Sequence, residues 1–253
     1  MTDHRDDPLA QAPMGKLAAH VIQELNCRQA VTPSGARRFV LDHLMRAICK
    51  RGAFDGAIAL DILRGHRVSV DRVIEVYIPE AATQLGQMWM DDTVDFSTVT
   101  IGALRLQSIL TEATGRVFYQ PNALLDLRSL VVVPEGEQHF LGASVAAAQL
   151  RRLGCDTHIS FAENDAALVR RAQFERPHMI LFTCARVVGL ESIGKSVLTL
   201  RNAMPKPPVI AVGGAVKAHK DIVQEITGAD LVTTQVKDVI AFCAQRRKAM
   251  MGE

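Results

Sequence analysis

The second half of the chain alternates short runs of β-branched and aliphatic residues with longer segments of helical periodicity. Continuous apolar strands that are each followed by a helix are typical of a parallel sheet with helices on both faces. We therefore predict an α/β fold whose residues 121–253 form a doubly wound, flavodoxin-like domain. The predicted strand and helix pairs are 129–133 and 141–153, 157–161 and 166–174, 179–183 and 190–203, 209–212 and 216–226, and 231–233 and 236–246.

The first half of the chain shows helical spacing alone. Apolar residues recur at three- and four-residue intervals around 41–48, over 57–63, from about 71 to 89 with a kink at Pro79, and over 97–117. We predict an N-terminal helical bundle domain over residues 36–120. We expect residues 1–35 to form a flexible arm with one helix over 17–25, and we predict a linker at the turn residues 119–122.

Composition narrows the class of protein. Twenty-nine basic and 27 acidic residues give a formal net charge of +2, so there is no strong electrostatic case for a nucleic-acid partner. The five cysteines are far apart and include no Cys-x-x-Cys pair, which argues against a disulfide framework and a structural zinc site. No apolar run approaches the roughly 18 residues of a membrane span. We therefore expect a soluble protein of the reducing cytoplasm.

The loop after the first predicted strand carries the most informative side chains. It reads Pro134-Glu-Gly-Glu137-Gln138-His139, and Gly142 follows at the start of the next helix. In an open parallel sheet, ligands bind beyond the carboxyl ends of the strands. A histidine there can give one ring nitrogen to a metal while a neighbouring carboxylate accepts the other N–H. We predict these roles for His139 and Glu137; the alternative is a solvated polar loop without a ligand.

Three further strand ends have small or polar residues. Thr183 ends the third predicted strand, Gly213 and Gly214 follow the fourth, and Thr233 ends the fifth. Adjacent glycines permit either a turn with positive φ or the close approach of a bulky ligand. Small polar residues can line a crevice or cap the next helix, as at Thr234. We predict that these strand ends line one continuous slot.

Together these residues resemble the motifs of the cobalamin-binding domain, which are Asp-x-His-x-x-Gly, Ser-x-Leu and Gly-Gly. The corresponding segments here are Glu137-x-His139-x-x-Gly142, Thr183-x-Ala185 and Gly213-Gly214. The resemblance spans nearly all of residues 128–248. It implies that His139 replaces the cofactor's benzimidazole as lower cobalt ligand, that Glu137 orients His139, and that the nucleotide tail enters the slot. It also implies clearance for the ring at Gly142 and a hydrogen bond to the tail from Thr183.

Two segments of the helical half carry a second resemblance. They are Leu85-Gly86-x-x-Trp89-x-x-Asp92 and Val99-Thr100-x-Gly102-x-x-Arg105-Leu-Gln107. They are similar to the helical cap of cobalamin photoreceptors and methionine synthases, and more closely to the AerR/PpaA-type antirepressors of purple photosynthetic bacteria. The resemblance implies that the indole of Trp89 covers the upper axial ligand. The alternatives are a core position for Trp89 and an ion pair between Arg105 and Asp92.

The same resemblance implies a function. It points to a light-responsive, cobalamin-binding transcriptional regulator that antagonises a photosystem-gene repressor of the PpsR/CrtJ type, and not to an enzyme. The cofactor would be adenosyl-, methyl- or hydroxocobalamin, with His139 as the metal ligand. DNA-binding photoreceptors have a Glu-His pair where this chain has Val99-Thr100, and a helix-turn-helix for which residues 1–35 are too poor in periodic sequence. We therefore expect no direct DNA contact.

Two other functions remain open. A haem-binding redox sensor of similar fold would also use His139, because imidazole ligates iron as readily as cobalt. A corrinoid carrier subunit of a methyltransferase would have the same bundle-plus-sheet layout. In the leading interpretation the cofactor-binding residues are Trp89, Glu137, Gln138, His139, Gly142, Thr183, Gly213, Gly214 and Thr233.

Overall fold

The computed structural model describes residues 30–115, 126–214 and 220–251. The chain divides into two compact units, residues 1–105 and 106–253. The division falls inside one helix, ahead of the boundary predicted at residue 120. The predicted linker over 119–122 and the predicted helix over 17–25 lie outside the described residues. No helix among the described residues is long and apolar enough to cross a membrane.

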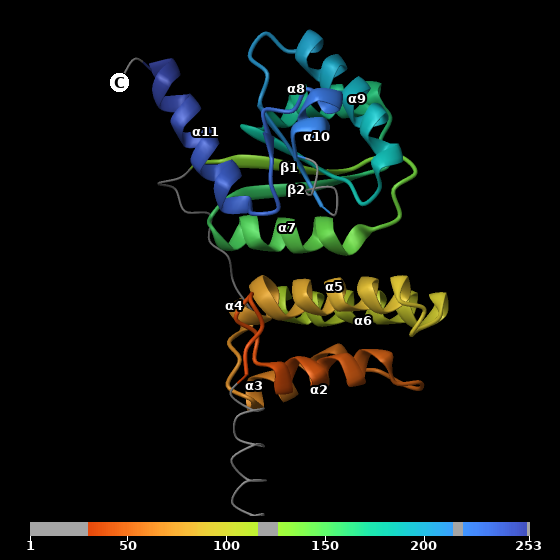
Figure 1. Ribbon diagram of the computed structural model, residues 1–253. Helices are drawn as coiled ribbons and strands as arrows, with labels where there is room; N and C mark the ends of the chain where they lie inside the picture. Colours follow the sequence, from red (N-terminus) through yellow and green to blue (C-terminus); the bar gives the residue numbers. More distant parts are fainter. Residues whose placement is uncertain (1–29, 116–125, 215–219, 252–253) are drawn as a thin grey trace, which may run out of the picture. The chain divides into compact units, whose positions relative to one another are not determined.

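The described part of the first unit is helical, as the spacing of its apolar residues predicts (Figure 1). Many of the apolar positions that repeat at helical spacing are buried and form the core of this unit, among them Leu41, Leu60 and Ile74. Ile101 and Leu104 of the predicted pattern are exposed. The helices are α2 (Arg38–Cys49), α3 (Gly56–Gly65), α4 (Val70–Arg72), α5 (Ile78–Met90) and the start of α6 (Phe96–Gly115).

Near Pro79, where the sequence predicts a kink, the structure has a π-helical turn over Val73–Tyr77, which ends two residues before the proline. The backbone N–H of Ile78 donates to the carbonyl of Val73, one residue farther back than in an α-helix. Pro79 has no N–H of its own, so it fits the beginning of α5, where helical N–H groups lack partners.

Arg105 holds the end of α2. Its guanidinium donates to the carbonyls of Ile48 at 2.9 Å and Gly52 at 2.7 Å, and also to that of Lys50. These carbonyls lie at and beyond the C-terminus of α2, where helical acceptors have no partner within the helix. The suggested ion pair between Arg105 and Asp92 is therefore not the role that the structure gives to this arginine.

The second unit contains a five-stranded parallel sheet in the order β2-β1-β3-β4-β5. This is the flavodoxin-like order, with its switch point between β1 and β3. The predicted fold is therefore confirmed. The strands are β1 (Arg128–Val133), β2 (Asp156–Phe161), β3 (Met179–Thr183), β4 (Val209–Gly213) and β5 (Leu231–Val232).

Helices cover both faces of the sheet (Figure 1). The helices α7 and α11 pack on one face in a cluster that includes Val131 and Leu150, and α8, α9 and α10 pack on the other around Ile180 and Phe182. Both cores keep the strand ends in fixed register, which positions the loops that follow. The helix bounds are α7 (Phe140–Arg152), α8 (Asp165–Glu175), α9 (Leu190–Ala203), α10 (Lys220–Thr227) and α11 (Val236–Met251).

Candidate functional site

The loop between β1 and α7 holds His139 by its neighbour Glu137. The ring Nδ1 of His139 lies 2.5 Å from Oε1 of Glu137, and the same oxygen accepts the backbone N–H groups of Gln138 at 2.8 Å and His139 at 3.0 Å. Because a carboxylate only accepts, this contact places the proton of a neutral imidazole on Nδ1. The lone pair of Nε2 is then the one available to a metal.

The second oxygen of Glu137 reaches across the switch point of the sheet. Oε2 accepts the backbone N–H of Ala185 at 3.0 Å, in the loop that follows β3. The side chain of Glu137 is only 8% exposed. Burial raises the pKa of this carboxyl, but the hydrogen bonds from the His139 ring and from the N–H groups of Ala185 and His139 outweigh burial and lower it overall. Glu137 is therefore a fixed anion that joins two loops.

The imidazole of His139 is open to solvent. Its side chain is 62% exposed, and His139 precedes the first residue of α7. One turn into that helix, a Cβ added to Gly142 would meet no atom within 4 Å. Across the described ranges, no hydrogen bond occupies Nε2 of His139. The imidazole is exposed, its Nδ1 is bound to Glu137, and there is free space at Gly142. This arrangement fits a large planar metal complex bound through Nε2.

A cavity of about 200 Å³ lies between the loops that follow β1 and β3. Its lining includes Glu137, Thr183 and Arg186, and the guanidinium of Arg186 donates to the carbonyl of Gly136 at 3.3 Å. The hydroxyl of Thr183 donates to the carbonyl of Val132 at 3.3 Å. The structure therefore brings Thr183 and Glu137 to one hollow.

The two glycines at the end of β4, Gly213 and Gly214, lie close to backbone of the neighbouring loops. Gly214 has a φ of +118°, and a Cβ there would lie 2.2 Å from the carbonyl oxygen of Cys184. A Cβ on Gly213 would lie 2.8 Å from the carbonyl oxygen of Thr233. The turn with positive φ considered from the sequence is present at Gly214. The groups close to the two glycines are backbone carbonyls of Cys184 and Thr233, and the close approach of a ligand stays a prediction.

Thr233 serves the helix after it. Its hydroxyl accepts the backbone N–H of Gln235 at 3.0 Å and donates to Asp238 at 2.6 Å. These bonds join the end of β5 to the turn before α11 and to Asp238 in the first turn of that helix. Thr233 is buried, and its place in a ligand-binding slot stays a prediction.

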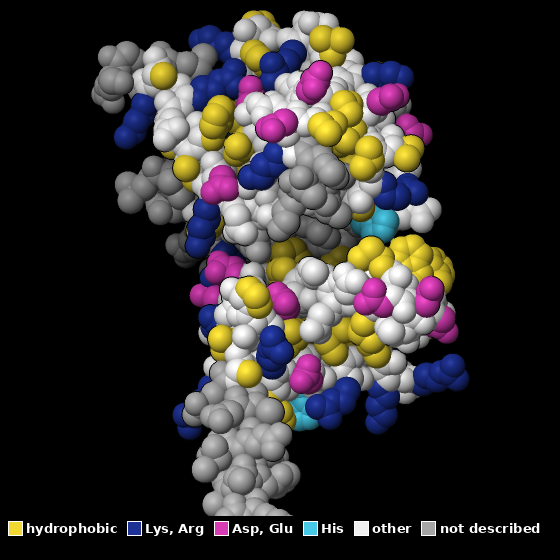
Figure 2. Space-filling model, viewed as in Figure 1, with side chains coloured by type: hydrophobic (Ala, Val, Ile, Leu, Met, Phe, Trp, Pro, Cys, Tyr) yellow, Lys and Arg dark blue, Asp and Glu magenta, His cyan; other side chains and the backbone are white. Residues whose placement is uncertain are grey.

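Trp89 is a surface residue of the helical unit. It is 51% exposed at the end of α5, so the core position considered for it is wrong. Figure 2 shows hydrophobic side chains gathered where α5 gives way to α6. The exposed apolar residues of this region are Trp89, Met90, Phe96, Ile101 and Leu104. An exposed apolar group of this extent is a feature of binding surfaces.

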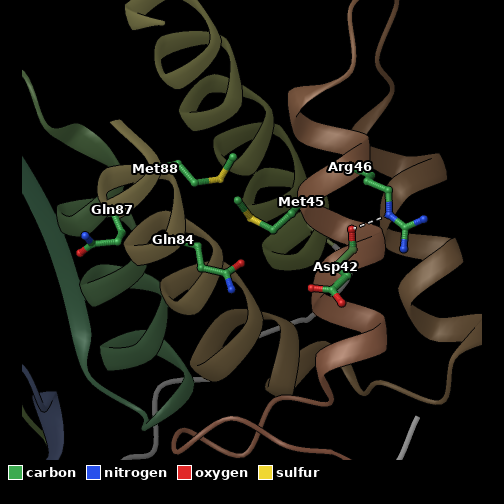
Figure 3. A pocket seen from close by; sticks show the side chains of 6 residues that line it. All are labelled: Asp42, Met45, Arg46, Gln84, Gln87 and Met88. Carbon is green, nitrogen blue, oxygen red and sulfur yellow. Dashed lines mark hydrogen bonds between the residues drawn. The ribbon is translucent and has the colours of Figure 1, made fainter. Parts of the chain in front are cut away.

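A second hollow on the helical unit was not anticipated from the sequence. It has a volume of about 510 Å³, and Figure 3 shows side chains of α2 and α5 on its two sides, with Met45 and Met88 pointing toward each other. None of the predicted site residues lines it. Its lining residues are Asp42, Met45, Arg46, Gln84, Gln87 and Met88.

The sequence analysis missed two backbone contacts of the site. Ala185 lies in the predicted Thr183-x-Ala185 segment, but its N–H was not expected to bind Glu137, and the approach of the Cys184 backbone to Gly214 was not expected either. Cys184 and Ala185 follow the end of β3 by one and two residues, and the flavodoxin-like strand order places them opposite the β1 loop. This position is the signal that predicts backbone contacts with the site.

Comparisons with known proteins agree with this arrangement. The family model of the B12 binding domain matches residues 127–241. An uncharacterized 20.5 kDa protein of the bchF-crtJ intergenic region of Rhodobacter capsulatus is 35% identical over 185 residues, which cover 73% of this chain and 96% of that protein. The monomethylamine corrinoid protein of Methanosarcina barkeri has a TM-score of 0.67 at 12% identity, covering 83% of this chain and 99% of the other. At that identity the likeness shows the fold alone.

Proposed function

Because this chain belongs to the AerR/PpaA-type family of B12-binding proteins, we propose that it is a light-responsive cobalamin-binding regulator that acts through another protein. The observation that carries the proposal is the hydrogen-bonded group of Glu137, His139 and Ala185 at the switch point of the sheet. It joins a metal-ligating side chain to the place where open α/β sheets bind ligands.

His139, Glu137 and Gly142 are the residues proposed to hold the corrinoid. Glu137 fixes the imidazole by Nδ1, so Nε2 is directed to an incoming metal without loss of ring freedom on binding. Gly142 leaves room beside it. An alkylcobalamin supplies a cobalt–carbon bond that visible light breaks. Trp89 is proposed as a further cofactor contact, supported by its exposure.

The proposed partner is a photosystem-gene repressor of the PpsR/CrtJ type. It is supported by the relative from the bchF-crtJ intergenic region. The exposed apolar group around Trp89 offers a surface whose burial would contribute to binding. A cofactor can shift the affinity for such a partner only if it binds two arrangements of the chain with different affinity.

The first test is corrinoid binding. Purified chain is mixed in darkness with adenosyl-, methyl- or hydroxocobalamin, and absorption spectra are recorded after gel filtration, before and after illumination. We expect co-elution of a corrinoid and loss of binding by at least tenfold in His139→Ala. His158→Ala is the matched control, because His158 is also exposed and hydrogen-bonded to a glutamate, at 3.0 Å. Failure of every corrinoid to co-elute would end the proposal.

The single tryptophan gives a second measurement. Its fluorescence reports Trp89 alone, and a bound corrinoid is a strong absorber that quenches a nearby indole. We expect quenching that saturates with corrinoid and is absent in His139→Ala. A Soret band on addition of haem that depends on His139 would favour the haem alternative instead, and methyl transfer to a thiol with a second subunit would favour the carrier alternative.

The partner is tested with a purified PpsR/CrtJ-type repressor. We expect the chain to weaken the repressor's DNA binding, with a difference between the dark and illuminated corrinoid forms. Equal effects of both forms would contradict a light-responsive role, and no effect would contradict this partner.

A further inference from the structure

Two histidines of the helical unit, neither of them among the predicted site residues, face each other. Nδ1 of His43, on α2, lies 3.4 Å from Nε2 of His66, which follows α3. The two rings are 5.4 Å apart between centroids. The ring of Phe39 contacts both, at 5.2 Å from His43 and 5.6 Å from His66. The two imidazole rings are thus paired, and both pack against the ring of Phe39.

The backbone holds both rings in place. His43 lies within α2, one helical turn after Phe39. His66 is the C-cap of α3, and its N–H donates to carbonyls of the last turn, including that of Ile62 at 3.1 Å. The carbonyl of His66 accepts a hydrogen bond from the guanidinium of Arg37. The pair therefore exists before any ligand binds, which lowers the entropic cost of binding.

The separation of the two nitrogens matches that of two ligands on one metal ion. Imidazole nitrogens lie about 2.0–2.1 Å from a tetrahedral Zn²⁺, which puts two of them roughly 3.3–3.4 Å apart. Neutral imidazole suits Zn²⁺, Ni²⁺ and Cu²⁺. One nitrogen of the pair must lose its hydrogen for both lone pairs to reach the ion, and small rotations of the exposed His43 ring bring them together.

We propose that His43 and His66 form a binding site for one divalent transition-metal ion, made of other residues than those proposed to hold the corrinoid. Among the described residues no group of three or more His, Cys, Asp and Glu is arranged to hold a metal, so water or a small ligand completes the coordination. The positive charge of Arg37 near His66 opposes a cation. The site is accordingly an exchangeable one, with open positions on the ion.

The test uses the full chain without an affinity tag and without added corrinoid. Calorimetric titration with Zn²⁺, Ni²⁺ or Cu²⁺ is expected to give one ion per chain, with Cu²⁺ bound most tightly because open imidazole sites follow the Irving–Williams order. His43→Ala and His66→Asn are each expected to weaken binding by about tenfold or more, since each removes one of two ligands. His158→Ala, an exposed histidine outside the pair, is expected to leave it unchanged.

Folding and placement are checked separately. Circular dichroism spectra and melting curves of the variants establish that the helical unit is intact; His43 is exposed, so His43→Ala is expected to fold. Nitrogen-15 spectra of the imidazoles should show His43 and His66 shifting together on addition of Zn²⁺. Unchanged affinity in a folded His43→Ala, or a shift of only one ring, would overturn the proposal, whether or not the chain binds a corrinoid.

Discussion

Two glycines at the carboxyl edge of the sheet show opposite surroundings. Gly142, at the start of α7, has open space where a Cβ would be, whereas Gly214, after β4, has the carbonyl oxygen of Cys184 only 2.2 Å from that position. The first glycine leaves room that the chain does not use, and the second lets the chain approach itself. Two glycines in a binding motif therefore serve different purposes, and their substitution should separate folding from binding.

The largest effect on stability is expected at Gly214, where the chain occupies the space that a Cβ would need. Gly214→Ala places a Cβ in contact with Cys184 and forces alanine to a φ of +118°. Backbone strain and overpacking together are expected to lower the free energy of unfolding by roughly 2–4 kcal/mol. Urea denaturation followed by circular dichroism measures this. A loss below about 1 kcal/mol, typical of an ordinary surface change, would show that the turn relaxes freely.

Glu137→Gln tests the loop between β1 and α7, which precedes Gly142. A carboxylate accepts at both oxygens, whereas glutamine has one acceptor, so its NH₂ group meets either the Ala185 N–H or the His139 contacts. We expect a loss of about 1–3 kcal/mol at pH 7. Glutamate 135, which is exposed on the same loop, provides the control Glu135→Gln, with an expected change near zero.

The effect of Glu137→Gln should also depend on pH. The pKa of Glu137 lies below its ordinary value of 4.5 in the folded chain, so the unfolded chain takes up the proton first. The stabilisation is complete above that ordinary value and disappears as the pH falls through the folded pKa. The difference in unfolding free energy between the wild type and the variant should therefore shrink below pH 4.5. A difference that grows in acid would contradict this sign.

A smaller effect is expected from Thr233→Val, next to the filled glycines. The variant loses the hydroxyl that bonds the N–H of Gln235 and the carboxylate of Asp238. Loss of such hydrogen bonds costs about 1 kcal/mol. Corrinoid affinity, measured by equilibrium dialysis, should stay the same because this hydroxyl is occupied within the chain. A large loss of affinity without loss of stability would return Thr233 to the proposed binding residues.

The smallest effect on stability, and of opposite sign, is expected from Gly142→Ala. Alanine has higher helix propensity and Gly142 is exposed within α7, so unfolding should become harder by about 0.5–1 kcal/mol. If the open space receives the cofactor, the same variant should bind a corrinoid less tightly. Higher stability with weaker binding would distinguish the two glycines; unchanged binding would show that the space is not used.

The order of the elements was predictable because each strand is a continuous apolar run followed by a helical pattern. The predicted bounds of β3 and α9 are those observed, since Pro177 and turn residues delimit them on either side. The juxtaposition of Glu137 and His139 was predictable from their spacing. Arg105 was not, because its acceptors are carbonyls more than fifty residues earlier, and a carbonyl leaves no mark in the residue type.

The two oxygens of Glu137 have a practical consequence. One oxygen binds the imidazole of His139, and the other accepts the amide N–H of Ala185 after β3. Because both oxygens belong to one carboxylate, a displacement of the imidazole ring changes the hydrogen bond to the Ala185 amide. The amide proton of Ala185 is therefore a built-in spectroscopic probe. Its chemical shift in the full chain would report the binding of a ligand to His139, although Ala185 lies in a different loop.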